Sequence, residues 1–187
     1  MLGACCLACS VWAMHFIGML AFETSLEVHY DMFLTGVSLL IMLFAALAAM
    51  SFLGQSQPGI RHYTLAALCI AAGVGIMHYT GMAAMRSNAL QHYDPNLVLA
   101  SVVVALFAAL LPMLMARHLR QGNVARPQLF KSSAALLMAG GIIATHYVGM
   151  HALTLVLPGG ASPQIPVTDN SLQSVSYTHL TLPTICS

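Results

Sequence analysis

The chain has 187 residues, of which 59% are hydrophobic and only 6% are charged, and its formal net charge is +1. An ordinary soluble domain carries about 25% charged residues, so this composition excludes a soluble globular protein that covers its core with charges. The small net charge and the lack of any Lys/Arg run exclude a nucleic-acid partner. We expect the apolar surface to face a lipid bilayer instead.

Apolar stretches without charges, each about 20 residues long, occur five times along the chain, and this length suits a membrane span. We predict a transmembrane helix in each, at residues 2–22, 32–53, 63–85, 97–116 and 132–157. Gly and Pro punctuate the short segments between them, so neighbouring helices should be antiparallel. The predicted fold class is all-α, a polytopic transmembrane bundle with five helices visible.

The basic residues predict the orientation of this bundle. Five of the six lie in or beside the second and fourth connections, residues 54–62 and 117–131: Arg61, Arg117, Arg120, Arg126 and Lys131. Positively charged loops stay in the cytoplasm, so we predict a multi-pass protein whose other connections, which carry Glu23, Glu27, Asp31, Asp94 and Asp169, face outward. Tyr30, Tyr63 and Tyr93 are expected at the membrane interfaces.

The C-terminal part of the chain departs from the membrane pattern. We expect a membrane domain over residues 1–157, a polar outer segment over 158–171, and a non-native tail over 172–187, which resembles vector-derived tails. Cys186 and His179 fall in that tail, so we do not expect them to serve a site.

One motif occurs three times, as MHFIGM from Met14, MHYTGM from Met77 and THYVGM from Thr145. The three histidines are 63 and then 68 residues apart, which is the length of one antiparallel helix pair with its loops. All three copies therefore fall on helices that run in the same direction, at one depth near the outer face. At 1.5 Å per helical residue, His15 and His78 should lie roughly 10 Å deep and His146 a little deeper.

Within each copy, the histidine and the second methionine are four residues apart and share a helix face. The glycine before that methionine leaves room for a neighbouring helix or a ligand. Imidazole and thioether are soft, neutral ligands that suit copper, while Ca²⁺ and Mg²⁺ need carboxylates that the spans lack. The predicted site combines His15, His78 and His146 with Met19, Met82 and Met150.

The residues leave other functions open. Two of the histidines could be axial ligands of a b-type haem, or the histidines could serve only helix packing. A small transporter or channel is a further alternative, although the spans carry no charged residue near the midplane and Pro112 is their only mid-helix proline. No nucleophile and base pair occurs, so we expect no enzyme.

The segments MHFIGMLAF, GIMHYTGMAAM and THYVGMHAL resemble the signature motifs of the bacterial MHYT domain. The resemblance spans residues 1–157 and implies a sensory module of the bacterial inner membrane with six or seven helices. It also implies copper, held by Met and His, that senses O2, CO or NO. By the same resemblance Met14 and Met77 join the candidate ligands, whereas Thr145 departs from the motif.

Members of this family are joined to a cytoplasmic output domain, either a cyclic di-GMP enzyme or a histidine kinase. The resemblance therefore implies such a domain as the signalling partner in full-length relatives. Since five helices are visible and no output domain is found, we expect a fragment truncated at both ends.

Overall fold

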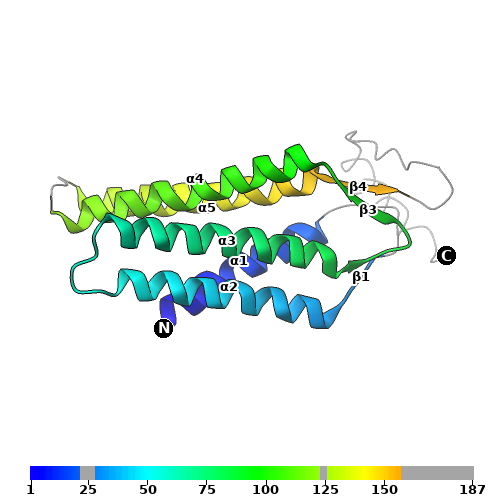
Figure 1. The fold of residues 1–187 in the computed structure, drawn as a ribbon, viewed down its shortest axis with the longest axis horizontal. Helices are drawn as coiled ribbons and strands as arrows, with labels where there is room; N and C mark the ends of the chain where they lie inside the picture. The colour runs from blue at the N-terminus through cyan, green and yellow to red at the C-terminus, as the bar shows by residue number, and fades with distance from the viewer. Residues whose placement is uncertain (22–27, 123–125, 157–187) are drawn as a thin grey trace, which may run out of the picture.

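The computed structural model describes residues 1–21, 28–122 and 126–156, and these residues form a bundle of five helices (Figure 1). The helices are α1 (Leu2–Leu20), α2 (Met32–Leu53), α3 (Ile60–Ala84), α4 (Pro95–Arg120) and α5 (Pro127–His151). Each is long and apolar enough to cross a membrane. The predicted all-α transmembrane bundle is confirmed.

Helices that follow one another in the chain pack side by side, and α1, α3 and α5 also contact each other. Small residues line the tightest contacts: Ala4, Ala8, Ala46, Ala49, Ala66 and Ala67 are fully buried. Close approach of backbones is what stabilises helix association in lipid, where no hydrophobic force joins the helices. The sequence predicted this packing from its many small residues.

Within the described residues, four short strands lie at one end of the bundle, and the sequence did not predict them. Strand β1 (His29–Tyr30) pairs with β2 (Met85–Arg86), and β3 (Leu90–Tyr93) pairs with β4 (Leu153–Val156), both antiparallel. The α2–α3 and α4–α5 connections lie at the opposite end (Figure 1). We call the strand-bearing end the cap end and the opposite end the basic end, after its Arg and Lys residues.

The predicted fifth span was wrong at its C-terminal boundary. Helix α5 ends at His151, and the apolar run that follows pairs with β3 instead of continuing the helix. A short apolar run fits a strand or a helix equally well by periodicity, so the sequence alone did not reveal this end. His146 consequently lies five residues before the end of its helix, as His15 does, and is no deeper.

The other boundaries differ by a few residues, mainly because helices at the basic end extend past the apolar spans. Helix α3 begins at Ile60 and not at residue 63, and α5 begins at Pro127 and not at residue 132. The predicted segments 158–171 and 172–187 lie outside the described residues, as do Glu23, Glu27 and Asp169.

Candidate metal centre

The three motif histidines meet in the interior of the bundle. The Nδ1 atom of His15 on α1 lies 3.2 Å from Nδ1 of His146 on α5 and 3.1 Å from Nδ1 of His78 on α3. The three side chains each offer one nitrogen, and these nitrogens lie within 4.8 Å of one another. All three residues are buried, with at most 3% of their surface exposed. The rings meet edge to face, with centroids 4.9 to 5.4 Å apart.

The opposite side of each imidazole packs against the glycine of another motif copy. The Nε2 atom of His15 lies where a side chain on Gly81 would begin, and His78 lies in the same way against Gly149. His146 completes the set against Gly18. The contacts therefore form a closed ring from α1 to α3, from α3 to α5, and from α5 back to α1. This ring explains why glycine follows each histidine by three residues.

The nitrogens of this cluster have an incomplete set of hydrogen bonds. The Nδ1 atom of His15 faces two other Nδ1 atoms, but one imidazole nitrogen either donates or accepts a proton. The three Nε2 atoms are buried and have no hydrogen-bond partner among the described residues. Three nitrogens bound to one ion at about 2.0–2.1 Å would be roughly 3.3–3.5 Å apart. The observed Nδ1 separations are close to that spacing, so the residues fit a metal ligated through Nδ1.

The predicted methionine ligands divide into two groups. Met19, Met82 and Met150 are buried in one cluster with Met85, next to residues of the strands. They lie one helical turn beyond the histidines toward the cap end. Met14 and Met77 belong to the other core cluster, toward the middle of the bundle.

The third motif copy begins with Thr145, and the structure shows what replaces methionine there. The Thr145 hydroxyl donates to the carbonyl oxygen of Gly141, one turn back on the same helix, at 2.9 Å. A threonine bonded in this way to its own helix cannot offer its hydroxyl hydrogen elsewhere. The first position of the motif therefore differs chemically among the three copies.

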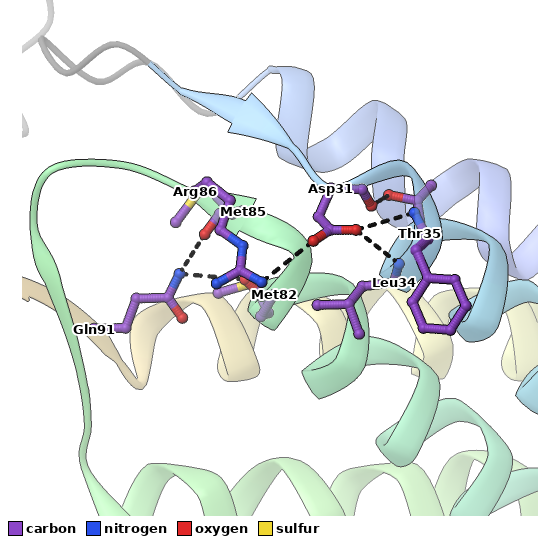
Figure 2. A network of polar contacts seen from close by, with 8 residues as sticks. Asp31, Leu34, Thr35, Met82, Met85, Arg86 and Gln91 are labelled. Atoms are coloured by element: carbon purple, nitrogen blue, oxygen red, sulfur yellow. Dashed lines mark hydrogen bonds and ion pairs between the residues drawn. The ribbon is translucent and has the colours of Figure 1, made fainter.

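A polar network closes the bundle beside the methionine cluster (Figure 2). Asp31 pairs with Arg86 at 3.2 Å and accepts hydrogen bonds from the backbone N–H groups of Leu34 and Phe33. The Leu34 bond, followed by the Arg86 bond, holds the pKa of the Asp31 carboxyl below its ordinary value. Gln91 donates to the carbonyl oxygen of Met85 at 2.9 Å and to that of Met82 at 3.3 Å. The network thus ties the end of α3 to the start of α2.

One side of the histidine cluster borders a pocket between α1 and α5. This pocket has a volume of about 210 Å³, and its lining includes His146, Tyr147 and Met150 from α5 and Gly18 from α1. Tyr147 is 57% exposed. The His146 imidazole therefore has a pocket beside it.

Sequence reasoning missed a set of supporting residues that also repeats. The tripeptide His29-Tyr30-Asp31 returns 63 residues later at 92–94, and Ser38 returns as Ser101. The Ser101 hydroxyl donates to the Val98 carbonyl and accepts from Tyr79, at 2.7 Å each. Ser38 accepts from the indole of Trp12 at 3.2 Å. The spacing between His15 and His78 was the signal that could have revealed these pairs.

Five membrane-spanning helices around a buried histidine cluster define a polytopic membrane protein, and comparison with known proteins gives its family. The family model described as MHYT, bacterial signalling protein N terminal repeat, matches residues 9–66 and 72–126. The chain belongs to the MHYT family. The two matched repeats each contain one even-numbered helix, and they begin 63 residues apart.

Curated signalling proteins resemble most of the chain. The cyclic di-GMP phosphodiesterase NbdA of Pseudomonas aeruginosa is 42% identical over 172 residues, which cover 92% of this chain and 22% of that protein. The bifunctional diguanylate cyclase/cyclic di-GMP phosphodiesterase MucR of the same organism is 36% identical over 150 residues, 80% of this chain and 22% of MucR. The signaling protein YkoW of Bacillus subtilis is 25% identical over 153 residues, 81% of this chain and 19% of YkoW.

The chain thus spans about a fifth of the length of these relatives. It is a sensory domain, and the enzymatic parts of the relatives lie outside the matched residues. No solved structure matches the chain.

Proposed function

We propose that the chain is a signal-sensing input domain that binds a copper ion through His15, His78 and His146. The observation that carries this proposal is the pair of Nδ1 separations, 3.2 and 3.1 Å, among buried imidazoles from three helices. Copper would supply redox chemistry and affinity for O2, CO or NO, while the neutral ligands suit a buried site. The chain's own residues hold the three nitrogens together and exclude water.

In this proposal the three buried methionines are further soft ligands of the ion or form the path by which it reaches the histidines. They are Met19, Met82 and Met150. They are buried together on the cap side of the histidines, and thioethers favour Cu(I). Met14 and Met77 are the weaker candidates, since they pack with the other core cluster.

The same separations favour copper over haem. Two axial nitrogens on opposite sides of a haem iron are about 4 Å apart, with the porphyrin between them. The Nδ1 atoms of His15 and His78 are only 3.1 Å apart, which leaves no room for a porphyrin between them. Haem remains the alternative cofactor, and its intense Soret absorption would distinguish it at once.

For signalling, we propose that the cap end faces outward and that the basic end, with residues 54–62 and 117–131, lies in the cytoplasm of a bacterial inner membrane. The positive-inside rule supports this orientation. An output domain at the cytoplasmic side would receive the signal, and the names of NbdA and MucR favour a cyclic di-GMP enzyme over a histidine kinase.

The test is the copper and iron content per chain of protein extracted from membranes. A variant with His15, His78 and His146 all changed to Ala should lose the metal. The matched control changes the exposed His92 and His118 to Ala and should keep it. Copper near one ion per chain, absent from the triple variant alone, is the expected result. A metal content that is equal in all three proteins would contradict the proposal.

A further inference from the structure

A second pocket lies at the basic end, far from the histidine cluster. It has a volume of about 470 Å³ and is bordered by the α2–α3 connection and the last turn of α4. Gln57, Gly59 and Tyr63 line one side, and Arg117 and Arg120 line the other. The lining contains two arginines and no carboxylate.

The two arginines leave positive charge that the described residues do not neutralise. Arg120 donates from Nη1 to the carbonyl oxygen of Leu53 at 3.1 Å, which fixes its position without removing its charge. Arg117 is half-buried and forms no ion pair within the residues that the structure describes. A guanidinium group has five N–H donors in a planar fork that matches a phosphate or a carboxylate.

The start of α3 adds to this positive potential. Gly59 precedes the helix and offers no side-chain cap to its first turn, which also lacks acidic residues. The free N–H groups of a helix N-terminus carry a partial positive charge and favour a bound anion. Gly59, the residue before α3, lines the same pocket as the arginines.

Tyr63 adds a hydrogen-bond donor to the lining of this pocket. The sequence placed it in an aromatic belt at the interface, but the structure buries it to 2% exposure beside the pocket. Its hydroxyl has no hydrogen-bond partner among the described residues, unlike that of Tyr79. The hydroxyl is not one of the buried unpartnered atoms among the described residues, so it remains accessible and can donate to a group bound in the pocket.

We propose that this pocket binds the phosphate of an anionic phospholipid headgroup. Arg117 and Arg120 would bind the phosphate oxygens, and the Tyr63 hydroxyl would donate to one of them. Lipid is the favoured source because the pocket lies at the ends of membrane-spanning helices, which is the level of the headgroups. Basic pockets between transmembrane helices on the cytoplasmic side are known to bind acidic headgroups.

Native mass spectrometry on the full chain in detergent would test this assignment, with short-chain phosphatidylglycerol and phosphatidylcholine as probes. We expect phosphatidylglycerol to bind and phosphatidylcholine to bind at least tenfold more weakly. Arg117→Gln should lower the affinity for phosphatidylglycerol about tenfold, the typical effect of losing a charge-assisted hydrogen bond. Tyr63→Phe should lower it about threefold or more while keeping the ring packed.

The matched control is Arg61→Gln, which removes one positive charge at the same end from an exposed residue outside the pocket lining. It should bind phosphatidylglycerol like the parent. Equal losses in Arg117→Gln and Arg61→Gln would overturn the pocket as the binding site. Displacement of the lipid by millimolar inorganic phosphate would assign the pocket to soluble phosphate and overturn the lipid source. Circular dichroism would verify that each variant is folded.

Discussion

The imidazole of His146 packs against Gly18, at the point where any side chain on that residue would begin. The contact joins the fifth helix to the first, across 128 residues of sequence. Its two equivalents join His15 to Gly81 and His78 to Gly149. The three glycines are thus as much a part of this cluster as the three histidines.

Gly81→Ala should disrupt the histidine cluster. Its methyl group would overlap the His15 ring, and overpacking of this kind costs about 1–3 kcal/mol. We expect lower thermal stability and a loss of bound copper. Gly75→Ala on the same helix is the matched control, because nothing lies within 4 Å of the added methyl group. If both variants keep parental stability and copper content, the packing ring does not constrain the site.

Each single histidine substitution should weaken copper binding. His15→Ala, His78→Ala and His146→Ala each remove one nitrogen from a set whose members lie within 4.8 Å, so no one of them is dispensable for a shared site. Copper affinity would be measured by competition with a chelator, with His118→Ala as the control at an exposed position. A variant that keeps parental affinity would place its histidine outside the metal's ligands.

The sequence predicted the five helices and placed His15, His78 and His146 toward the same end of the bundle, because span length and motif spacing determine both. It also predicted that Gly18, Gly81 and Gly149 leave room for a close approach. It did not reveal that the occupant is the imidazole of another copy, since this depends on how three helices rotate against one another. Strand β4 was missed because its partner, β3, lies about 60 residues away, and local periodicity carries no information about such pairing.

The hydrogen bond between Tyr79 and Ser101 should stabilise the packing of α3 on α4. Ser101 is 1% exposed, and its hydroxyl already donates to Val98, so it accepts from the Tyr79 hydroxyl at 2.7 Å. Ser101→Ala and Tyr79→Phe should each lower the free energy of unfolding by about 1 kcal/mol. The double variant should lose less than the sum, as measured by denaturant titration in detergent. Additive losses would mean that the two hydroxyls do not interact.

Acid should loosen the cap end through Asp31. Because the pKa of Asp31 is lowered in the folded protein from an ordinary value of 3.8, its contribution to stability is complete at higher pH and is lost as pH falls through the lowered pKa. We expect the melting temperature to fall more steeply below about pH 4 in the parent than in Asp31→Asn.

Arg86→Gln should reduce this acid effect without abolishing it, because the backbone N–H groups of Leu34 and Phe33 still bond the carboxylate. Parent and Asp31→Asn profiles that run parallel down to pH 3 would refute a role for this carboxyl. Hydrogen exchange at the Asp31 amide, which bonds to Ala84 at 2.8 Å, would report the same loosening locally.

The three contacts between a histidine and a glycine form a closed set, so each of the three helices takes part in two of them. Each of α1, α3 and α5 packs its own imidazole against the glycine of one of the other two helices, and its own glycine contacts the imidazole of the remaining one. If one helix turned by one residue, about 100°, its imidazole would leave the glycine that it contacts. Its own glycine would at the same time move away from the imidazole of another helix. Two of the three contacts would therefore be lost together. The packing of the three helices at this level therefore depends on all three contacts at once. A substitution on any one of the three helices at this level would be felt by the other two.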